Sequence, residues 1–310
     1  MATKQPKKQS KTLNSKQKLA EASRYFKDND LLLNPPVKRA AYSDRMAWVL
    51  ASMAHLVYDP FEEKDGKAKE LLIAKLKGGG FKWVDGFSDP GTDTQAFLVK
   101  TREFAVLAFR GTEVRKRQDV RTDIAATTVS IIEGRVHTGF IRAYKSVEPQ
   151  IEASLEKVKD LPLYITGHSL GAALATLATQ YLERNHIIRD RIAACYTFGS
   201  PRVGNNEFDR EFKSAIYRVV NTTDIVTIIP LLVMGYIHIG DVRFLEPSAG
   251  NVKRSIPTLQ RALFFLAGIV RLFGPWVGDH GIIKYREKLA AIARNRNHGL
   301  FMDGTSGGKF

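Results

Sequence analysis

The chain has a single cysteine, fewer acidic than basic residues, and no long apolar run. Cys195 has no cysteine partner, which excludes an internal disulfide and a four-thiolate zinc site. No window approaches the roughly 18 apolar residues of a transmembrane helix, and the nearest, 262–273, is interrupted by Arg271. The first residues lack the apolar core of a secretory signal, so the sequence shows no targeting segment.

The basic excess is concentrated at the start of the chain. The 310 residues carry a formal charge of +15, and residues 1–20 contain lysines but no acid. We predict that residues 1–30 form a disordered basic arm, because this stretch has little apolar surface to bury. We favour a solvated tail for this arm, and the alternative is an arm that contacts nucleic acid or an anionic membrane. A single globular domain is then expected over 31–296, followed by a flexible tail over 297–310.

Strand-like and helix-like segments alternate along the middle of the chain. Strands are expected at 95–101, 103–110, 161–166, 192–198 and 216–220, and helices at 139–159, 170–184, 206–214 and 282–294. This alternation predicts an α/β fold with a mostly parallel central sheet and helices on both faces. The run Phe104–Phe109 is almost entirely apolar, which is typical of a central strand buried on both sides.

A G-x-S-x-G pattern lies between one predicted strand and the next helix, at Gly167–Gly171. The two glycines permit a tight turn that exposes Ser169 at the carboxyl end of the sheet. This strand–turn–helix setting is the one that a nucleophilic serine requires. Ser169 is therefore the candidate nucleophile.

Such a serine needs a histidine base and an acid that orients the base, and in this architecture the acid precedes the histidine. Asp224 follows the predicted strand 216–220 and is favoured as the acid over three alternatives: Asp209, Asp241 and Asp279. His280 lies in a loop before the last helix and is favoured as the base. His238 remains the alternative base, whereas His298 lies in the polar tail.

Six segments in this order resemble the class 3 lipases, the α/β-hydrolase group typified by triacylglycerol lipases of filamentous fungi. The resemblance runs from about residue 50 to residue 289. The segments are FRGT, VHTGF, GHSLGAALA, FGSPRVGN, NTTDIVTIIP, and a late Asp-His followed by Tyr285.

The resemblance implies Ser169, Asp224 and His280 as the catalytic triad. It also implies backbone N–H groups of Thr112 and Leu170 as an oxyanion hole, and a lid over about 113–126. The lid segment departs from the family pattern, because basic residues replace bulky apolar ones. The segment is either a solvated charged loop or a basic rim that draws the enzyme to anionic lipid or fatty acid. An apolar segment at 256–276 is a second departure. It packs in the core, lines an acyl-chain pocket or docks on lipid.

The resemblance thus implies a carboxylic-ester hydrolase that acts on acylglycerols at a lipid–water interface, without cofactor or metal. Two alternatives share the triad: a phospholipase A1, and a short-chain or feruloyl-type esterase. A third is a non-catalytic module that binds lipid or nucleic acid. The missing signal and disulfide favour a cytoplasmic protein or one exported by a non-classical route, and a bacterial origin. Oligomeric state cannot be derived from the sequence.

Overall fold

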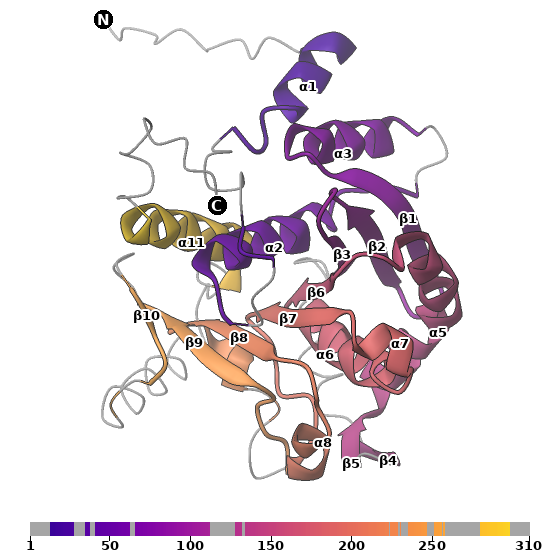
Figure 1. Cartoon of the computed structure of the whole chain (residues 1–310), viewed down its shortest axis with the longest axis vertical. Helices are drawn as coiled ribbons and strands as arrows, with labels where there is room; N and C mark the ends of the chain where they lie inside the picture. The colour runs from indigo at the N-terminus through magenta and orange to yellow at the C-terminus, as the bar shows by residue number, and fades with distance from the viewer. Residues whose placement is uncertain are drawn as a thin grey trace, which may run out of the picture.

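An eight-stranded sheet forms the centre of the protein (Figure 1), with the strand order β1-β2-β3-β6-β7-β8-β9-β10. The computed structural model describes residues 13–27, 35–37, 41–62, 66–111, 128–131, 134–222, 224–228, 230, 235–246, 251–255, 257 and 280–297. The strands are β1 (Lys82–Asp89), β2 (Thr94–Lys100), β3 (Ala105–Phe109), β6 (Leu163–His168), β7 (Ile192–Phe198), β8 (Ile216–Asn221), β9 (Asp241–Leu245) and β10 (Val252–Lys253).

The five strands from β3 to β9 in this order pair in parallel, and the outer strands pair antiparallel. The carboxyl ends of β6, β7 and β8 therefore lie at one edge of the sheet. This arrangement confirms the predicted α/β class with a mostly parallel sheet.

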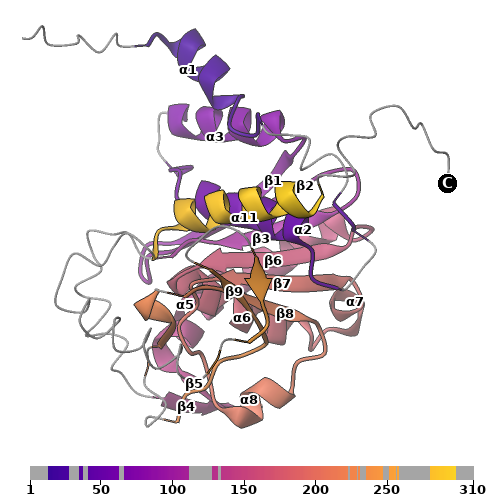
Figure 2. The same ribbon diagram turned by 90° about the vertical axis from the view of Figure 1, so that its left-hand side faces the viewer.

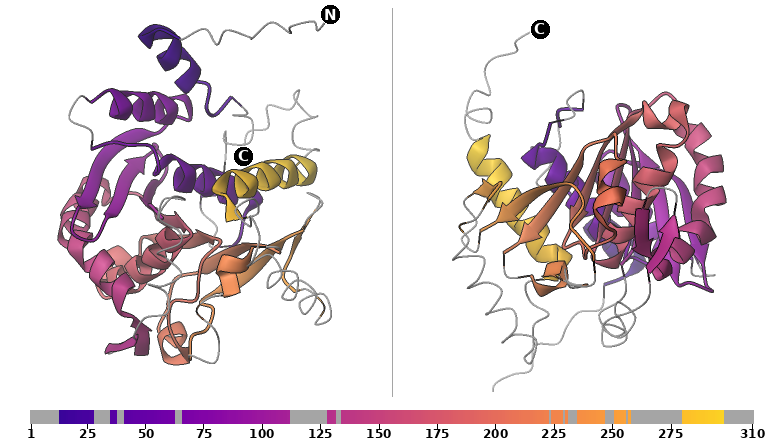
Figure 3. Two further views of the ribbon diagram at one scale, coloured as in Figure 1. Left: turned by 180° about the vertical axis from the view of Figure 1, so that it is seen from behind. Right: turned by 90° about the horizontal axis from the view of Figure 1, so that it is seen from below.

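Helices cover both faces of the sheet (Figure 2). On one face lie α2 (Asp44–Leu56) and α11 (Ile282–Arg296), which contact each other and are seen from behind in Figure 3. On the other face lie α5 (Thr138–Leu155) and α6 (Leu170–Leu182). Each face has its own cluster of buried apolar side chains.

The strand β3 supplies side chains to both clusters. Val106 and Ala108 point to the α2 side, and Ala105, Leu107 and Phe109 to the α6 side, with every residue buried. Successive side chains of a strand point to opposite faces. The continuous apolar run is thus explained by burial on two sides, as the sequence predicts.

The prediction of a disordered arm over residues 1–30 is wrong for residues 13–27. Helix α1 (Ser15–Ala22) begins with a capping box between Asn14 and Gln17, and Phe26 is fully buried beyond its end. The helix packs on α3 (Lys67–Gly78), as Figure 2 shows. This short segment is stabilised by tertiary packing. The low apolar content of the arm as a whole does not indicate that packing.

The helix α8 (Asn206–Arg210) ends four residues before the predicted boundary at Ser214. The buried Glu183 carboxylate accepts hydrogen bonds from the backbone N–H groups of Lys213 (3.0 Å) and Ser214 (2.6 Å). Those N–H groups are therefore bound to the side chain of Glu183, the residue that follows α6, and not to helical carbonyls. The remaining elements are β4 (Thr128–Ile131), β5 (Gly134–His137), α7 (His186–Arg189) and the short 3₁₀ turns η3 (Glu156–Val158) and η4 (Ile225–Ile228).

Three predicted segments lie wholly or almost wholly outside the described residues: the lid over 113–126, the apolar segment 256–276, and the tail beyond Asn297. The predicted domain boundaries, which depend on them, stay predictions. Within the part of the chain that the structure describes, no helix is both long enough and apolar enough to cross a membrane.

Candidate active site

Ser169 lies on a sharp turn between β6 and α6. Its backbone has φ 58° and ψ −127°, a conformation that residues other than glycine rarely adopt. The turn is tight because the flanking glycines let backbones approach closely. A Cβ on Gly167 would lie 2.1 Å from the carbonyl oxygen of Gly171, and one on Gly171 would lie 2.3 Å from that of Phe109. The sequence pattern thus reflects a steric requirement at both glycines.

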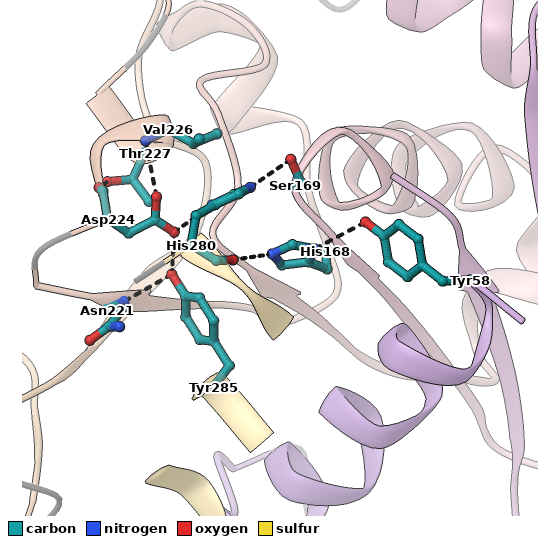
Figure 4. Close-up of polar contacts among 9 residues, drawn as sticks. All are labelled: Tyr58, His168, Ser169, Asn221, Asp224, Val226, Thr227, His280 and Tyr285. Atoms are coloured by element: carbon teal, nitrogen blue, oxygen red, sulfur yellow. Dashed lines mark hydrogen bonds and ion pairs between the residues drawn. The ribbon is translucent and has the colours of Figure 1, made fainter. Parts of the chain in front are cut away.

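Three side chains from different parts of the sheet edge meet at this turn (Figure 4). Ser169 Oγ lies 2.8 Å from His280 Nε2, and His280 Nδ1 lies 2.8 Å from Asp224 Oδ2. The carboxylate fixes the tautomer: Nδ1–H donates to Asp224, so Nε2 accepts from the serine hydroxyl. All three residues are buried, with exposures of 9%, 1% and 5% for Ser169, His280 and Asp224. The structure brings together the three residues that the sequence singles out.

The Asp224 carboxylate has further donors. Tyr285 Oη donates to the same Oδ2 at 2.6 Å, and the backbone N–H of Val226 donates to Oδ1 at 3.0 Å. The Tyr285 hydroxyl in turn accepts from the backbone N–H of Asn221 at 3.0 Å. Burial, and next the Asp224 charge, raise the pKa of Tyr285 well above its ordinary value, so the phenol remains a proton donor. These contacts hold the carboxylate in one orientation.

The role of Tyr285 escapes sequence reasoning, which notes the residue only as part of a motif. The available signal is its spacing, because Tyr285 follows His280 by five residues on the helix that begins at Ile282. That spacing becomes informative only once α11 is known to lie against the end of β8.

The candidate oxyanion donors are described in part. Leu170 is the first residue of α6, where the first N–H groups of a helix have no partner within the helix. Thr112 lies outside the described residues, but its neighbour Gly111 is described. A Cβ on Gly111 would lie 3.3 Å from Ser169 Cβ, so the chain leading to Thr112 passes directly beside the serine.

The alternative residues have other partners. His238 lies beside Arg202 and Arg218, and within the described residues it forms no hydrogen bond with Ser169 or Asp224. Burial, and next these two guanidinium groups, lower its pKa to about 2. Asp241 forms an ion pair with Arg243 (2.7 Å), and Asp209 accepts from the N–H of Gly240 (3.3 Å). Asp279 and His298 lie outside the described residues.

Across the described ranges, no three His, Cys, Asp or Glu side chains gather as metal ligands would. The hydrogen-bonded serine, histidine and aspartate instead form a nucleophile, its base, and the acid that orients the base.

Residues 106–234 match the family model described as lipase (class 3). The secreted mono- and diacylglycerol lipase 1 of Fusarium solani is 33% identical over 153 residues, which cover 47% of this chain and 45% of that protein. Phospholipase A1-II 1 of Oryza sativa subsp. indica is 30% identical over 186 residues, which cover 51% of this chain and 46% of that protein.

The fold is also similar to that of a lipase of solved structure. The lipase from Rhizopus microsporus var. chinensis superposes with a TM-score of 0.53 at 26% identity, over 73% of this chain and 82% of that chain. The chain spans about half the length of the curated relatives it matches. These relatives come from a fungus and a plant, so the expected bacterial origin has no support among them. The chain is therefore similar to the class 3 lipases in sequence over residues 106–234, and to fungal lipases in fold.

Proposed function

We propose that this protein is a serine carboxylic-ester hydrolase that acts on acylglycerols. The proposal rests on one observation, the buried hydrogen-bonded chain from Ser169 through His280 to Asp224 on a strained turn. A serine hydroxyl is a weak nucleophile until an adjacent base takes its proton. Acylglycerol is the favoured substrate class because the Fusarium solani relative is named a mono- and diacylglycerol lipase.

In the first half of the reaction, Ser169 Oγ attacks the ester carbonyl carbon while its proton moves to His280 Nε2. The carbonyl electron pair moves to oxygen, and the N–H groups of Leu170 and Thr112 stabilise the oxyanion. Asp224 stays ionised and stabilises the imidazolium through the bond to Nδ1. When the carbon–oxygen bond to the alcohol breaks, Nε2–H protonates the leaving oxygen. The products are the free alcohol and an acyl group on Ser169.

The second half returns the enzyme to its starting state. His280 Nε2 takes a proton from a water molecule, whose oxygen attacks the acyl carbon. The tetrahedral intermediate collapses, the bond to Ser169 Oγ breaks, and the serine recovers its proton from His280. The carboxylic acid is released, and no net proton remains on the enzyme.

The decisive experiment compares ester hydrolysis by the wild type and by Ser169→Ala. We expect the substitution to lower kcat on emulsified triolein and on para-nitrophenyl esters by a factor on the order of 10⁴ or more. The matched control is Ser154→Ala, another buried serine, whose hydroxyl donates to Asp85 at 2.6 Å far from the turn. Activity that survived Ser169→Ala would exclude this mechanism and favour a non-catalytic binding module.

A phospholipase A1 is the second candidate, because the Oryza sativa relative carries that name. The same triad serves both reactions, and the substrate decides between them. Equal amounts of wild-type protein should be assayed on triolein and on phosphatidylcholine vesicles. Faster release of fatty acid from phosphatidylcholine would assign the protein to the phospholipases. A strong preference for short para-nitrophenyl esters over both lipids would assign it to the short-chain esterases.

We further propose that the basic segment 113–126 acts as a lid whose charges contact anionic lipid at the interface. Its composition supports this, with Arg115, Lys116, Arg117 and Arg121 in a short stretch. Export is favoured because the Fusarium solani relative is named as secreted. Adding anionic lipid to a triolein emulsion should raise the rate for the wild type more than for a variant with these four residues changed to Gln.

A further inference from the structure

His168 lies between Tyr58 and the backbone of His280 (Figure 4). Its Nε2 is 2.6 Å from the carbonyl oxygen of His280, and its Nδ1 is 3.0 Å from Tyr58 Oη. The side chain is 1% exposed, so both ring nitrogens are bound within the protein and not by bulk water.

The two contacts determine the tautomer of His168. A backbone carbonyl can only accept a hydrogen bond, so Nε2 carries the proton and donates to His280. In the neutral ring, Nδ1 then has a lone pair and accepts from the Tyr58 hydroxyl. The hydrogen bonds therefore run in one direction, from Tyr58 through His168 to the carbonyl of His280.

The bound carbonyl belongs to the residue that acts as the base. His280 precedes Gly281, the N-cap residue of α11, which has no side chain that could form a capping bond. The rings of His168 and His280 also lie against each other, with centroids 4.6 Å apart and planes at 35°. His168 thus fixes both the main chain and one ring face of His280. It immediately precedes Ser169, so a single rigid strand end carries the nucleophile and the support for the base.

Tyr58 contacts both His168 and the backbone of Gly111, which leads to the candidate oxyanion donor Thr112. A Cβ on Gly111 would lie 2.4 Å from Tyr58 Oη, so the hydroxyl packs directly on the backbone at the end of β3. Tyr58 itself follows α2, which is packed into the core on the opposite face from α6. The pair therefore connects α2, the end of β3, the nucleophile turn and the start of α11.

We propose that His168, with its tautomer fixed by Tyr58, is a positioning residue that holds His280 in line between Ser169 and Asp224. The inference rests on the proposed function, since it concerns the same reaction. The Ser169–His280 contact is productive over a narrow range of geometry, and a displacement of about 1 Å can lower a rate by about 100-fold. A carbonyl released from His168 would let the His280 backbone turn away from that geometry.

The test is a pair of substitutions at His168 that separate its two hydrogen bonds. In His168→Asn, the amide lies near the position of Nδ1 and keeps the Tyr58 contact, but nothing reaches the carbonyl of His280. In His168→Gln, the longer side chain places an N–H donor near the position of Nε2. We expect His168→Asn to lower kcat on a soluble para-nitrophenyl ester by about 10- to 100-fold, with KM changed by less than about twofold. His168→Gln should recover most of the loss.

A second tyrosine–histidine pair provides the control. Tyr25 Oη lies 2.7 Å from His55 Nδ1, also partly buried, but neither residue touches the triad. His55→Asn should change the melting temperature and leave kcat unchanged. If His168→Asn does not fold, Tyr58→Phe replaces it in the comparison. That variant keeps the His168 ring but removes the Tyr58 hydroxyl that favours the Nε2–H tautomer. It should lower kcat severalfold, and Tyr25→Phe should leave kcat unchanged.

The outcomes distinguish this inference from the proposed function. Wild-type activity equal to that of Ser169→Ala would overturn the function. An active wild type, an inactive Ser169→Ala and a folded His168→Asn with kcat within about twofold of wild type would overturn only the role of His168. A His168→Gln variant no faster than His168→Asn would likewise overturn it.

Discussion

His280 and His238 both follow β8 in the chain and are both largely enclosed by protein, but the charges around them are opposite. His280 contacts the Asp224 carboxylate at 2.8 Å, and Tyr285 and a backbone N–H hold that carboxylate in place. Burial lowers the pKa of His238 to about 2, and the guanidinium groups of Arg218 and Arg202 act in the same direction.

The difference shows which surroundings allow a histidine to act as a base. An imidazole takes a proton readily only where the resulting cation is stabilised, and a carboxylate on the far nitrogen does this. Two cations beside the ring have the reverse effect. A buried histidine is therefore not a candidate base by burial alone, and the sign of its nearest charge separates these two residues.

Replacing each histidine in turn tests which of the two is the base. His280→Ala should lower kcat/KM for ester hydrolysis by a factor on the order of 10⁴ or more, because Ser169 loses its base. His238→Ala should leave kcat/KM within about threefold of wild type, provided that it folds. Loss of activity in the second variant and not in the first would reverse the assignment.

The partner acid should show the next largest effect. Asp224→Asn keeps the shape of the side chain but removes the charge that stabilises the imidazolium, so we expect kcat to fall by about 10³- to 10⁴-fold. The control is Asp241→Asn, which removes a carboxylate paired with Arg243 at 2.7 Å away from the site. Steady-state kinetics on one soluble ester would measure both, and equal losses would argue against Asp224 as the orienting acid.

The hydrogen-bond donors around Asp224 can be tested in the same way. Tyr285→Phe removes the 2.6 Å bond to Oδ2, and kcat should fall about 10-fold with little change in KM. Tyr236→Phe is the matched change two residues from His238, where the buried hydroxyl has no hydrogen-bond partner among the described residues. That variant should keep full activity. A Tyr285→Phe enzyme as fast as wild type would show that the other donors suffice to orient the carboxylate.

The smallest effect is one of stability and concerns His238. Its pKa in the folded protein, about 2, lies below the ordinary value of about 6.5, so the unfolded chain binds more protons between these pH values. Stability should therefore fall as the pH drops below about 6.5, and His238 alone should contribute about 1–2 kcal/mol of loss between pH 7 and pH 5. His238→Gln should show a correspondingly smaller loss in urea unfolding at the two pH values. Equal losses would show that His238 is not held neutral.

Local sequence signals predict the central part of the fold and the nucleophile turn. The strand β7 has the predicted bounds, and the glycines around Ser169 have steric reasons that any G-x-S-x-G turn would share. Asp224 could be chosen because it follows a core strand, and His280 because it precedes a helix in a loop. Each of these inferences depends on neighbours in sequence.

Features that depend on distant packing could not be derived in this way. Helix α1 is ordered by its contact with α3, and the outer strands β1, β9 and β10 show weak alternation because only part of their surface is buried. The contacts of His168 join residues 110 and 112 positions apart, to Tyr58 and His280. A sequence pattern over a few neighbouring residues cannot predict contacts between residues so far apart in the chain.

Covalent labelling measures directly whether His280 and Asp224 activate Ser169 as a nucleophile. The wild type would be treated with a para-nitrophenyl alkylphosphonate, which phosphonylates activated serines. The masses of the intact protein and of its peptides would then be measured by mass spectrometry. We expect one adduct per chain, located on Ser169, absent in Ser169→Ala and formed far more slowly in His280→Ala. An adduct on another residue, or labelling of Ser169 at the same rate in His280→Ala, would contradict this mechanism.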